Sequence, residues 1–254
     1  SVLDEEAPFV FADLARSGRA ETGGGSPGEV AVEVRKRLRL GEAEPIRNIC
    51  GLLEASGVKV LPISVASEGF FGLSISREGG GPAVVVNTWG RISVERWIFT
   101  AAHELGHLLL HPGAFDAADG AERAAEEKEA DRFAAELLLP EAGFRKEWAS
   151  AAGLSFVDRV LTVKRMYRVS YKTILFRLAD SSPMQRKVWG RFQAEFKSRS
   201  GGTLRNHAEP EGLERARLVA ARSRERELSS VDLSATVGVP LELALRCRSG
   251  LEEI

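Results

Sequence analysis

The segment from Phe99 to His111 reads F-T-A-A-H-E-L-G-H-L-L-L-H, which places the pattern H-E-x-x-H inside an apolar run that favours a helix. A helix advances about 100° per residue, so His103 and His107 project from one face, a single turn apart. Both imidazoles can then bind one metal ion, and Glu104 lies beside them where a general base is needed. The pattern therefore predicts a metal-bearing helix and indicates hydrolytic chemistry.

The residues around this pattern support a helix. Thr100 can begin the turn, and Gly106 leaves room for a close backbone approach. The chain has four histidines, and three of them fall between positions 103 and 111. We expect His111 to end the helix, because Pro112 follows it and cannot continue the hydrogen-bonded ladder.

A catalytic zinc ion takes three protein ligands and keeps a fourth position open, so a third ligand is required. The stretch 122–139 reads E-R-A-A-E-E-K-E-A-D-R-F-A-A-E-L-L-L and predicts a second helix with an apolar stripe. Glu126 and Glu129 each lie one turn before a core position, and Glu127 lies three residues before Ala130. Periodicity alone leaves these three carboxylates open as the third ligand.

The runs E-R-W-I-F-T-A-A-H-E-L-G-H-L-L-L-H-P, residues 95–112, and E-K-E-A-D-R-F-A-A-E-L-L-L-P, residues 127–140, together resemble the ImmA/IrrE family of bacterial metallopeptidases. The resemblance implies that His103, His107 and Glu129 bind Zn²⁺, with Mn²⁺ as an alternative ion in the cell, and that Glu104 is the general base. Asp131 matches an Asn or Asp position of the family, where it can orient a histidine ligand.

The chain before the metal helix predicts helices over 29–40 and 45–56 and short strands over 58–65, 70–76 and 83–87. The expected fold class is α+β, with a zincin-like peptidase core over residues 29–150, as the resemblance also implies. Peptidases of this kind hold an extended substrate against an edge strand, and residues 84–87 are the candidate strand for that pairing. The glycine-rich start, residues 1–28, is expected to be a flexible arm.

After Pro140 the pattern changes to two short helices, the second running from Tyr171 to Leu178, with Ser170 as its N-cap. This arrangement predicts a helix-turn-helix within residues 151–198, followed by a small all-helical module over 199–254. Core positions of the second helix are expected to be Ile174, Leu175 and Leu178, and the expected exposed positions are Lys172, Thr173 and Arg177.

Residues 185–226 carry eleven Lys or Arg against five Glu, although the whole chain is nearly neutral, with 35 basic and 36 acidic residues. This local excess permits contact with DNA through 151–226 or docking of an acidic partner. The chain has two cysteines, Cys50 and Cys247, which form neither a disulfide framework nor a metal cluster. No membrane-length apolar run and no signal-like start is present, so we expect a cytoplasmic protein with no membrane contact.

Two functions remain open at this stage. The first is a zinc-dependent, site-specific endopeptidase, whose substrate, by family resemblance, is a helix-turn-helix repressor of stress, DNA-damage-response or mobile-element genes. The alternative is a DNA-binding transcriptional regulator with a structural or vestigial metal site. The presence of Glu104 favours the first, because a structural site has no need of a base. An oxyanion-stabilising residue is also needed; of Tyr167, Tyr171 and His207, we expect Tyr171 to serve.

Overall fold

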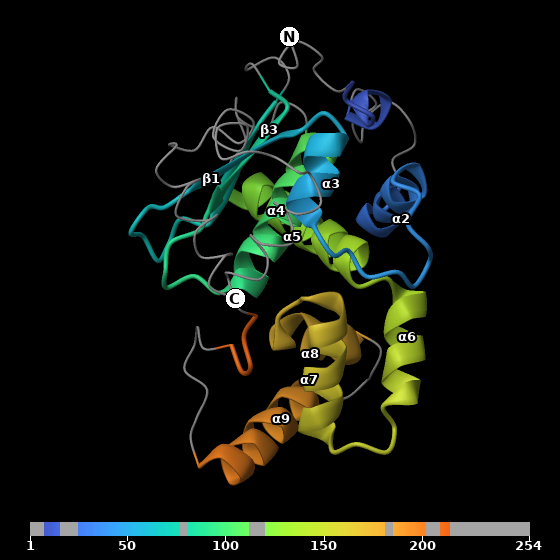
Figure 1. The fold of residues 1–254 in the computed structure, drawn as a ribbon, viewed down its shortest axis with the longest axis vertical. Helices are drawn as coiled ribbons and strands as arrows, with labels where there is room; N and C mark the ends of the chain where they lie inside the picture. Colours follow the sequence, from blue (N-terminus) through green and yellow to red (C-terminus); the bar gives the residue numbers. More distant parts are fainter. Residues whose placement is uncertain are drawn as a thin grey trace, which may run out of the picture.

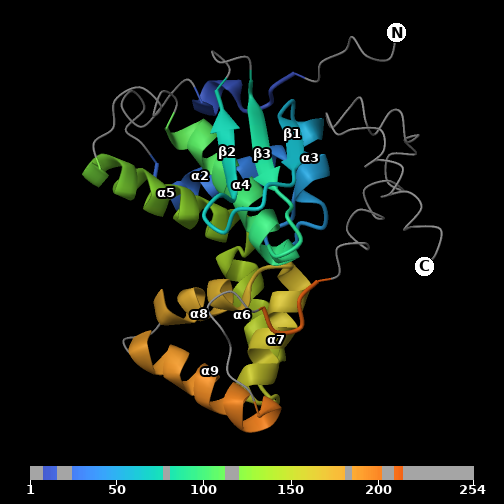
Figure 2. The same ribbon diagram turned by 90° about the vertical axis from the view of Figure 1, so that its left-hand side faces the viewer.

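The computed structural model describes residues 8–15, 25–76, 81–111, 120–180, 185–201 and 209–213. Figures 1 and 2 show a sheet covered by helices in one part and a purely helical part beside it. The predicted α+β class is confirmed. The first part contains α2 (Pro27–Arg37), α3 (Ile49–Ala55), β1 (Lys59–Ile63), β2 (Gly72–Ile75), β3 (Ala83–Asn87), α4 (Val94–Leu110) and α5 (Gly120–Leu138). The second contains α6 (Glu141–Ser150), α7 (Phe156–Tyr167), α8 (Tyr171–Asp180) and α9 (Gln185–Ser200).

The three strands form one sheet in the order β1-β3-β2, with β1 parallel and β2 antiparallel to β3. All five residues of β3 are buried, as expected for a central strand with helices packed against it. The prediction that residues 84–87 form an edge is therefore wrong, because both sides of β3 are already hydrogen-bonded. Within the described chain, β2 is an outer strand, and it packs directly against α4.

Helix α4 begins at Val94, earlier than the predicted start at Thr100, because the side chain of Ser93 accepts a hydrogen bond from the backbone N–H of Arg96 at 3.2 Å. One face of α4 lies on β2 and β3, and another lies on α5. A Cβ atom at Gly106 would lie 3.0 Å from Cδ1 of Phe133 in α5. The absence of a side chain at Gly106 thus allows the close approach of the two helices.

The described part of the expected N-terminal arm is packed on the core. Phe11 is fully buried, and the backbone N–H of Val10 donates to the carbonyl of Ser56 at 3.1 Å. Arg37 makes two hydrogen bonds to Asp13, at 2.5 and 2.8 Å. Residues 8–15 therefore belong to the sheet-containing part, in contrast to the expected flexible arm.

The pair α7 and α8 has the predicted short connection, with Arg168 in the left-handed conformation at the end of α7. Ile174 and Leu175 are buried as expected. The predicted exposed face is wrong, because Thr173 and Arg177 are buried. The guanidinium of Arg177 donates to both carboxylate oxygens of Glu136 and to the carbonyl of Leu139, at the end of α5. This face of α8 packs on the end of α5.

Two helices were missed by the sequence interpretation, α6 and α9. Cys50 is buried, whereas Cys247 and most of the predicted C-terminal module lie outside the described residues. Residues 209–213 are described, and Figure 1 shows them beside α7 and α8. In the described part of the chain, no helix has the length and apolar character needed to cross a bilayer.

Candidate metal centre

Helix α4 brings His103 and His107 together as the sequence predicts. Their side chains lie one turn apart, and the two Nε2 atoms are separated by 3.0 Å. Both residues are partly buried where α4 packs on α5. Since Nε2 points to the same place in both rings, the pair presents two nitrogen donors to one position.

Glu127 of α5 supplies the third donor. Its carboxylate oxygens lie 3.2 Å from Nε2 of His103 and 3.5 Å from Nε2 of His107. These three residues form the group whose ligand atoms are close enough to hold one ion. Glu129, expected from the family resemblance, instead lies 3.2 Å from Nε2 of His111. The structure thus places the carboxylate of Glu127 beside both Nε2 atoms and the carboxylate of Glu129 beside His111.

The different positions of Glu127 and Glu129 have a simple geometric cause. At about 100° per residue, Glu127 and Glu129 project from α5 in nearly opposite directions about the helix axis. Both flank the buried stripe that begins at Ala130, so periodicity relative to the core could not separate them. The crossing of α4 over α5 decides which flank faces the two histidines, and that crossing depends on contacts such as the one between Gly106 and Phe133.

The nitrogen and oxygen atoms of the three residues lie at, or slightly inside, the separations that a small tetrahedral ion requires. Bonds of about 2.0–2.2 Å to a tetrahedral centre place the ligand atoms about 3.3–3.6 Å apart. The two Nε2 atoms are 3.0 Å apart, Oε2 of Glu127 is 3.2 Å from Nε2 of His103, and Oε1 of Glu127 is 3.5 Å from Nε2 of His107. Two imidazoles with one carboxylate are also a donor set that suits zinc. The carboxylate of Glu127 is more than half exposed, so solvent reaches this side of the cluster.

The outer nitrogens of the histidines are also engaged. Asp131 lies one turn after Glu127 on α5, and its Oδ1 is 2.9 Å from Nδ1 of His103. This contact fixes the ring and leaves Nε2 of His103 facing the cluster, the orienting role expected for Asp131. His111 is the C-cap of α4, as predicted, and its Nδ1 lies 3.1 Å from Nδ1 of His107.

The two histidines have different protonation tendencies. Burial, followed by the positive charges of His103 and His111, lowers the pKa of His107 to about 4. Burial also acts to lower the pKa of His103, but the hydrogen bond to Asp131 and the nearby carboxylates outweigh it and raise the pKa overall. The neutral imidazole, which is the form that binds a metal ion, is therefore strongly favoured at His107.

Glu104 lies on the sheet side of α4 and is 7% exposed. A Cβ atom at Gly72 of β2 would come within 3.3 Å of its Oε1 atom, so the absent side chain leaves space for the carboxylate. Burial raises the pKa of Glu104, opposed by the charge of His103 and a hydrogen bond from Ser74. A buried carboxylate beside these two imidazoles has the position and the basicity of a proton acceptor.

The structure does not place Tyr171 with this cluster. Its ring is 2% exposed and stacks on Phe192 of α9, with the ring centroids 5.1 Å apart. Tyr167 is equally buried, and its hydroxyl donates to the carbonyl of Ala43 at 2.9 Å. Both rings are held in packing contacts, Tyr171 within the helical part and Tyr167 against Ala43. His207 lies outside the described residues.

Arg96 is a residue near the cluster that the sequence interpretation did not identify. It lies seven residues before His103 on α4, so it projects from nearly the same face two turns earlier. Its guanidinium carbon stands 3.9 Å from the centre of the Phe71 ring, within the electrostatic influence of Asp131 and Glu127. The seven-residue spacing was the available signal, but an arginine on a helix surface is too common to be singled out.

Residues 53–179 match the family model described as the IrrE N-terminal-like domain, Peptidase_M78, which covers half of the chain. The chain belongs to the M78 peptidase family. This matched region contains β1–β3, the helices that carry the cluster, and α6–α8. The family resemblance found in the sequence is thereby confirmed.

Among solved structures, the M78 protein is similar to a chain described as a Mycobacterium tuberculosis transcriptional regulator. The two are 15% identical with a TM-score of 0.45, and the match covers 70% of this chain. This chain spans about half, 52%, of the length of the regulator. A search of curated proteins gives no match.

Proposed function

We propose that this M78-family protein is a metal-dependent endopeptidase, with His103, His107 and Glu127 as metal ligands and Glu104 as general base. The observation that carries the proposal is the convergence of two imidazole nitrogens and the carboxylate of Glu127, with N–N and N–O separations of 3.0–3.5 Å, beside the buried carboxylate of Glu104. A structural metal site requires the three donors but gives no role to Glu104.

Zinc, when bound, supplies Lewis acidity to the scissile carbonyl and lowers the pKa of a nearby water. Glu104 accepts a proton from the attacking water, whose oxygen bonds to the carbonyl carbon. The C–N bond then breaks, and Glu104 returns the proton to the departing amine nitrogen. Asp131 keeps His103 oriented throughout, because its hydrogen bond fixes the ring.

The substrate chain is proposed to lie along β2. This strand lies at the outside of the described sheet, and Gly72 is adjacent to Glu104. An extended peptide added to the free edge of β2 would gain backbone hydrogen bonds there. This placement replaces the expectation for residues 84–87, which lie in the central strand.

The proposed substrate is a helix-turn-helix repressor, as the family resemblance implies. The test uses the purified, zinc-loaded chain and the helix-turn-helix repressor encoded nearest to it. Glu104→Gln is the comparison, because it keeps the size of the side chain and removes the base. Cleavage is followed by mass spectrometry, and bound metal is quantified in both proteins.

We expect the wild type to cut at a single site and Glu104→Gln to cut about 10²–10⁴-fold more slowly at equal metal content. Equal cutting by both proteins would exclude Glu104 as the base. Failure of the metal-loaded wild type to cut any helix-turn-helix repressor would refute the endopeptidase proposal, and specific DNA binding by the same sample would then favour a regulator.

A further inference from the structure

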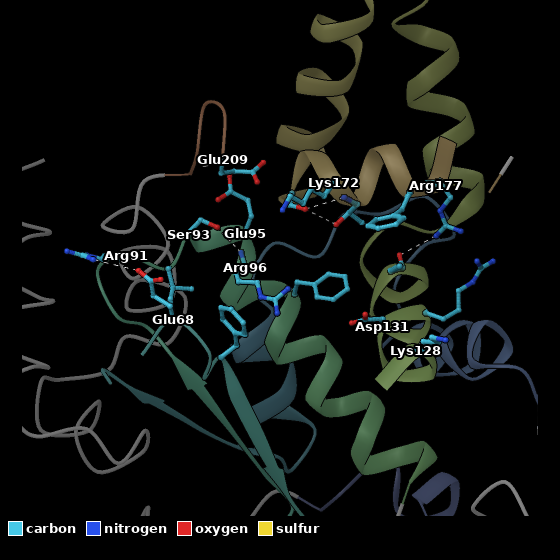
Figure 3. A pocket seen from close by; sticks show the side chains of 18 of the residues that line it. Glu68, Arg91, Ser93, Glu95, Arg96, Lys128, Asp131, Lys172, Arg177 and Glu209 are labelled. Atoms are coloured by element: carbon cyan, nitrogen blue, oxygen red, sulfur yellow. Dashed lines mark hydrogen bonds and ion pairs between the residues drawn. The ribbon is translucent and has the colours of Figure 1, made fainter. Parts of the chain in front are cut away.

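A cleft of about 720 Å³ lies between α8 and the sheet-containing part of the chain (Figure 3). Its walls come from α4, α5, α8 and the segment before α4. Figure 3 shows Arg96 reaching from α4 into the middle of the cleft, with Lys172 and Arg177 on α8 opposite. Four aromatic side chains line it, and these are Phe71, Trp89, Phe99 and Phe176.

The cleft extends to the metal centre. Two of its lining residues, Asp131 and Phe99, contact His103 directly. Oδ1 of Asp131 is 2.9 Å from Nδ1 of His103, and the centroids of the Phe99 and His103 rings are 6.5 Å apart. A chain bound at the metal centre can therefore continue into the cleft within a few residues.

The acidic residues that line the cleft have cationic partners. Glu68 pairs with Arg91 at 3.7 Å, and Asp180 pairs with Arg132 at 2.6 Å. Glu95 and Glu209 both pair with the buried Lys164, at 2.5 and 3.2 Å, and Asp131 contacts His103. Each of these carboxylates therefore contacts a basic side chain, with Glu95 and Glu209 sharing one lysine, and this contact weakens its repulsion of an acidic ligand.

Two of the lining cations, Arg96 and Lys128, make no ion pair with any residue in the part of the chain that is described. Arg96 stacks on Phe71, where burial lowers its pKa against the raising charges of Asp131 and Glu127. Stacking holds the guanidinium in place but leaves its N–H donors for a ligand. The cleft thus offers, beside the metal centre, two cationic side chains that form no direct ion pair with the described residues.

The opposite wall offers an apolar contact. Phe176 of α8 is 60% exposed, which is unusual for so large an apolar side chain, and its ring packs edge-on against Trp189 of α9 at 5.1 Å. That packing fixes the ring without covering it. An exposed, fixed aromatic ring in a cleft is a suitable contact for a bulky apolar side chain.

We propose that this cleft binds the substrate segment next to the scissile bond, and that it selects a segment carrying an acidic side chain and a bulky apolar one. Arg96 is the specificity-determining residue for the acidic side chain, and Phe176 contacts the apolar one. The proposal rests on the proposed peptidase function, because the occupant is its substrate. The charge complementarity of Arg96 and Lys128 is what identifies an acidic peptide as the occupant.

Binding is measured with the full, zinc-loaded chain carrying Glu104→Gln, so that no peptide is cut. The probes are fluorescent ten-residue peptides that differ only in two positions. At these two positions the first peptide carries Leu and Glu, the second Leu and Gln, the third Leu and Lys, and the fourth Ala and Glu. Fluorescence anisotropy at low and high salt gives the affinity of each peptide, since attraction between exposed charges weakens in salt.

We expect the Leu and Glu peptide to bind about tenfold to a hundredfold more tightly than its Gln counterpart, the range of a charge-assisted hydrogen bond. Arg96→Gln should remove this preference, and Arg96→Glu should transfer it to the Lys peptide. Arg145→Gln is the matched control, because Arg145 is an exposed cation of α6, paired with Glu141 and outside the cleft.

Equal binding of the Glu, Gln and Lys peptides would overturn the proposal, and this result needs no Arg96 variant to fold. Loss of the preference in Arg145→Gln as well as in Arg96→Gln would also overturn it. Cleavage by the wild type without this preference would leave the peptidase function standing and remove the cleft assignment. Selective binding with no cleavage by the wild type would support the cleft assignment and remove the peptidase function.

Discussion

Lys164 of α7 lies between two buried carboxylates where the sheet-containing part meets the helical part. Its replacement by methionine tests how much this ion cluster contributes to joining the two parts. Its Nζ is 2.5 Å from Oε1 of Glu95 and 3.2 Å from Oε1 of Glu209. Lys164 and Glu95 are 1% and 0% exposed. The same oxygen of Glu95 accepts the backbone N–H of Leu213 at 2.9 Å, so the lysine also supports residues 209–213 against α4.

Lys164→Met keeps most of the side-chain volume but leaves two carboxylates buried without their cation. Breaking a buried ion pair from one side costs about 3–5 kcal/mol. A protein of this size loses about 2–4 °C of melting temperature per kcal/mol, so the expected decrease is about 6–20 °C. The matched control is Arg165→Met, because the neighbouring Arg165 pairs with Glu211 at the surface, where such pairs contribute below about 1 kcal/mol.

The assay is thermal unfolding followed by circular dichroism, with the wild type and both variants at several pH values. Burial raises the pKa of Glu209 even in the wild type. An acid with a raised pKa in the folded state takes up a proton there first, so stability falls as pH rises from its unfolded pKa through its folded pKa. Lys164→Met should therefore recover part of its stability as pH is lowered. Equal melting temperatures for Lys164→Met and Arg165→Met would refute the reasoning.

Three further outcomes are expected. Glu127→Gln should abolish stoichiometric zinc binding by the isolated chain, whereas Glu129→Gln should retain it; competition with a chromophoric chelator measures both, and the opposite result would restore Glu129 as the ligand. Asp131→Asn should weaken zinc binding by about 10–100-fold in the same titration, because the His103 ring loses its orienting carboxylate. Gly106→Val should destabilise the fold by about 1–3 kcal/mol in urea unfolding, since even a Cβ atom would lie 3.0 Å from Phe133.

The local features of this site could be predicted because they depend on helix period alone. Two histidines four residues apart must share a helix face, whatever the rest of the chain does. The start of α4 was misplaced because Ser93, a good N-cap, lies one turn before an arginine and a tryptophan that disguise the amphipathic pattern. Helix α6 was missed for a similar reason, since its N-cap position is Pro140 and makes no side-chain cap hydrogen bond.

Contacts between elements could not be predicted from helix period and local motifs. A run of valines predicts a buried strand, but the position of β3 in the middle of the sheet depends on which strands pair with it. Arg177 has the pattern of an exposed helix residue, yet the carbonyls at the end of α5 and the carboxylate of Glu136 provide it with buried partners. A long cationic side chain can be exposed or buried, and its neighbours in the folded structure determine which.

The sequence by itself determined the family, the α+β class, and the shared helix face of His103 and His107 with Glu104 beside them. These follow from periodicity and local motifs, which act over a single turn or strand. The tertiary structure alone decided that Glu127 faces the histidines, that β2 is the outer strand beside Glu104, and that α8 turns Arg177 inward. Each of these depends on the packing of elements distant in the chain, and packing is fixed by the shape of side chains on both partners, which no single segment contains.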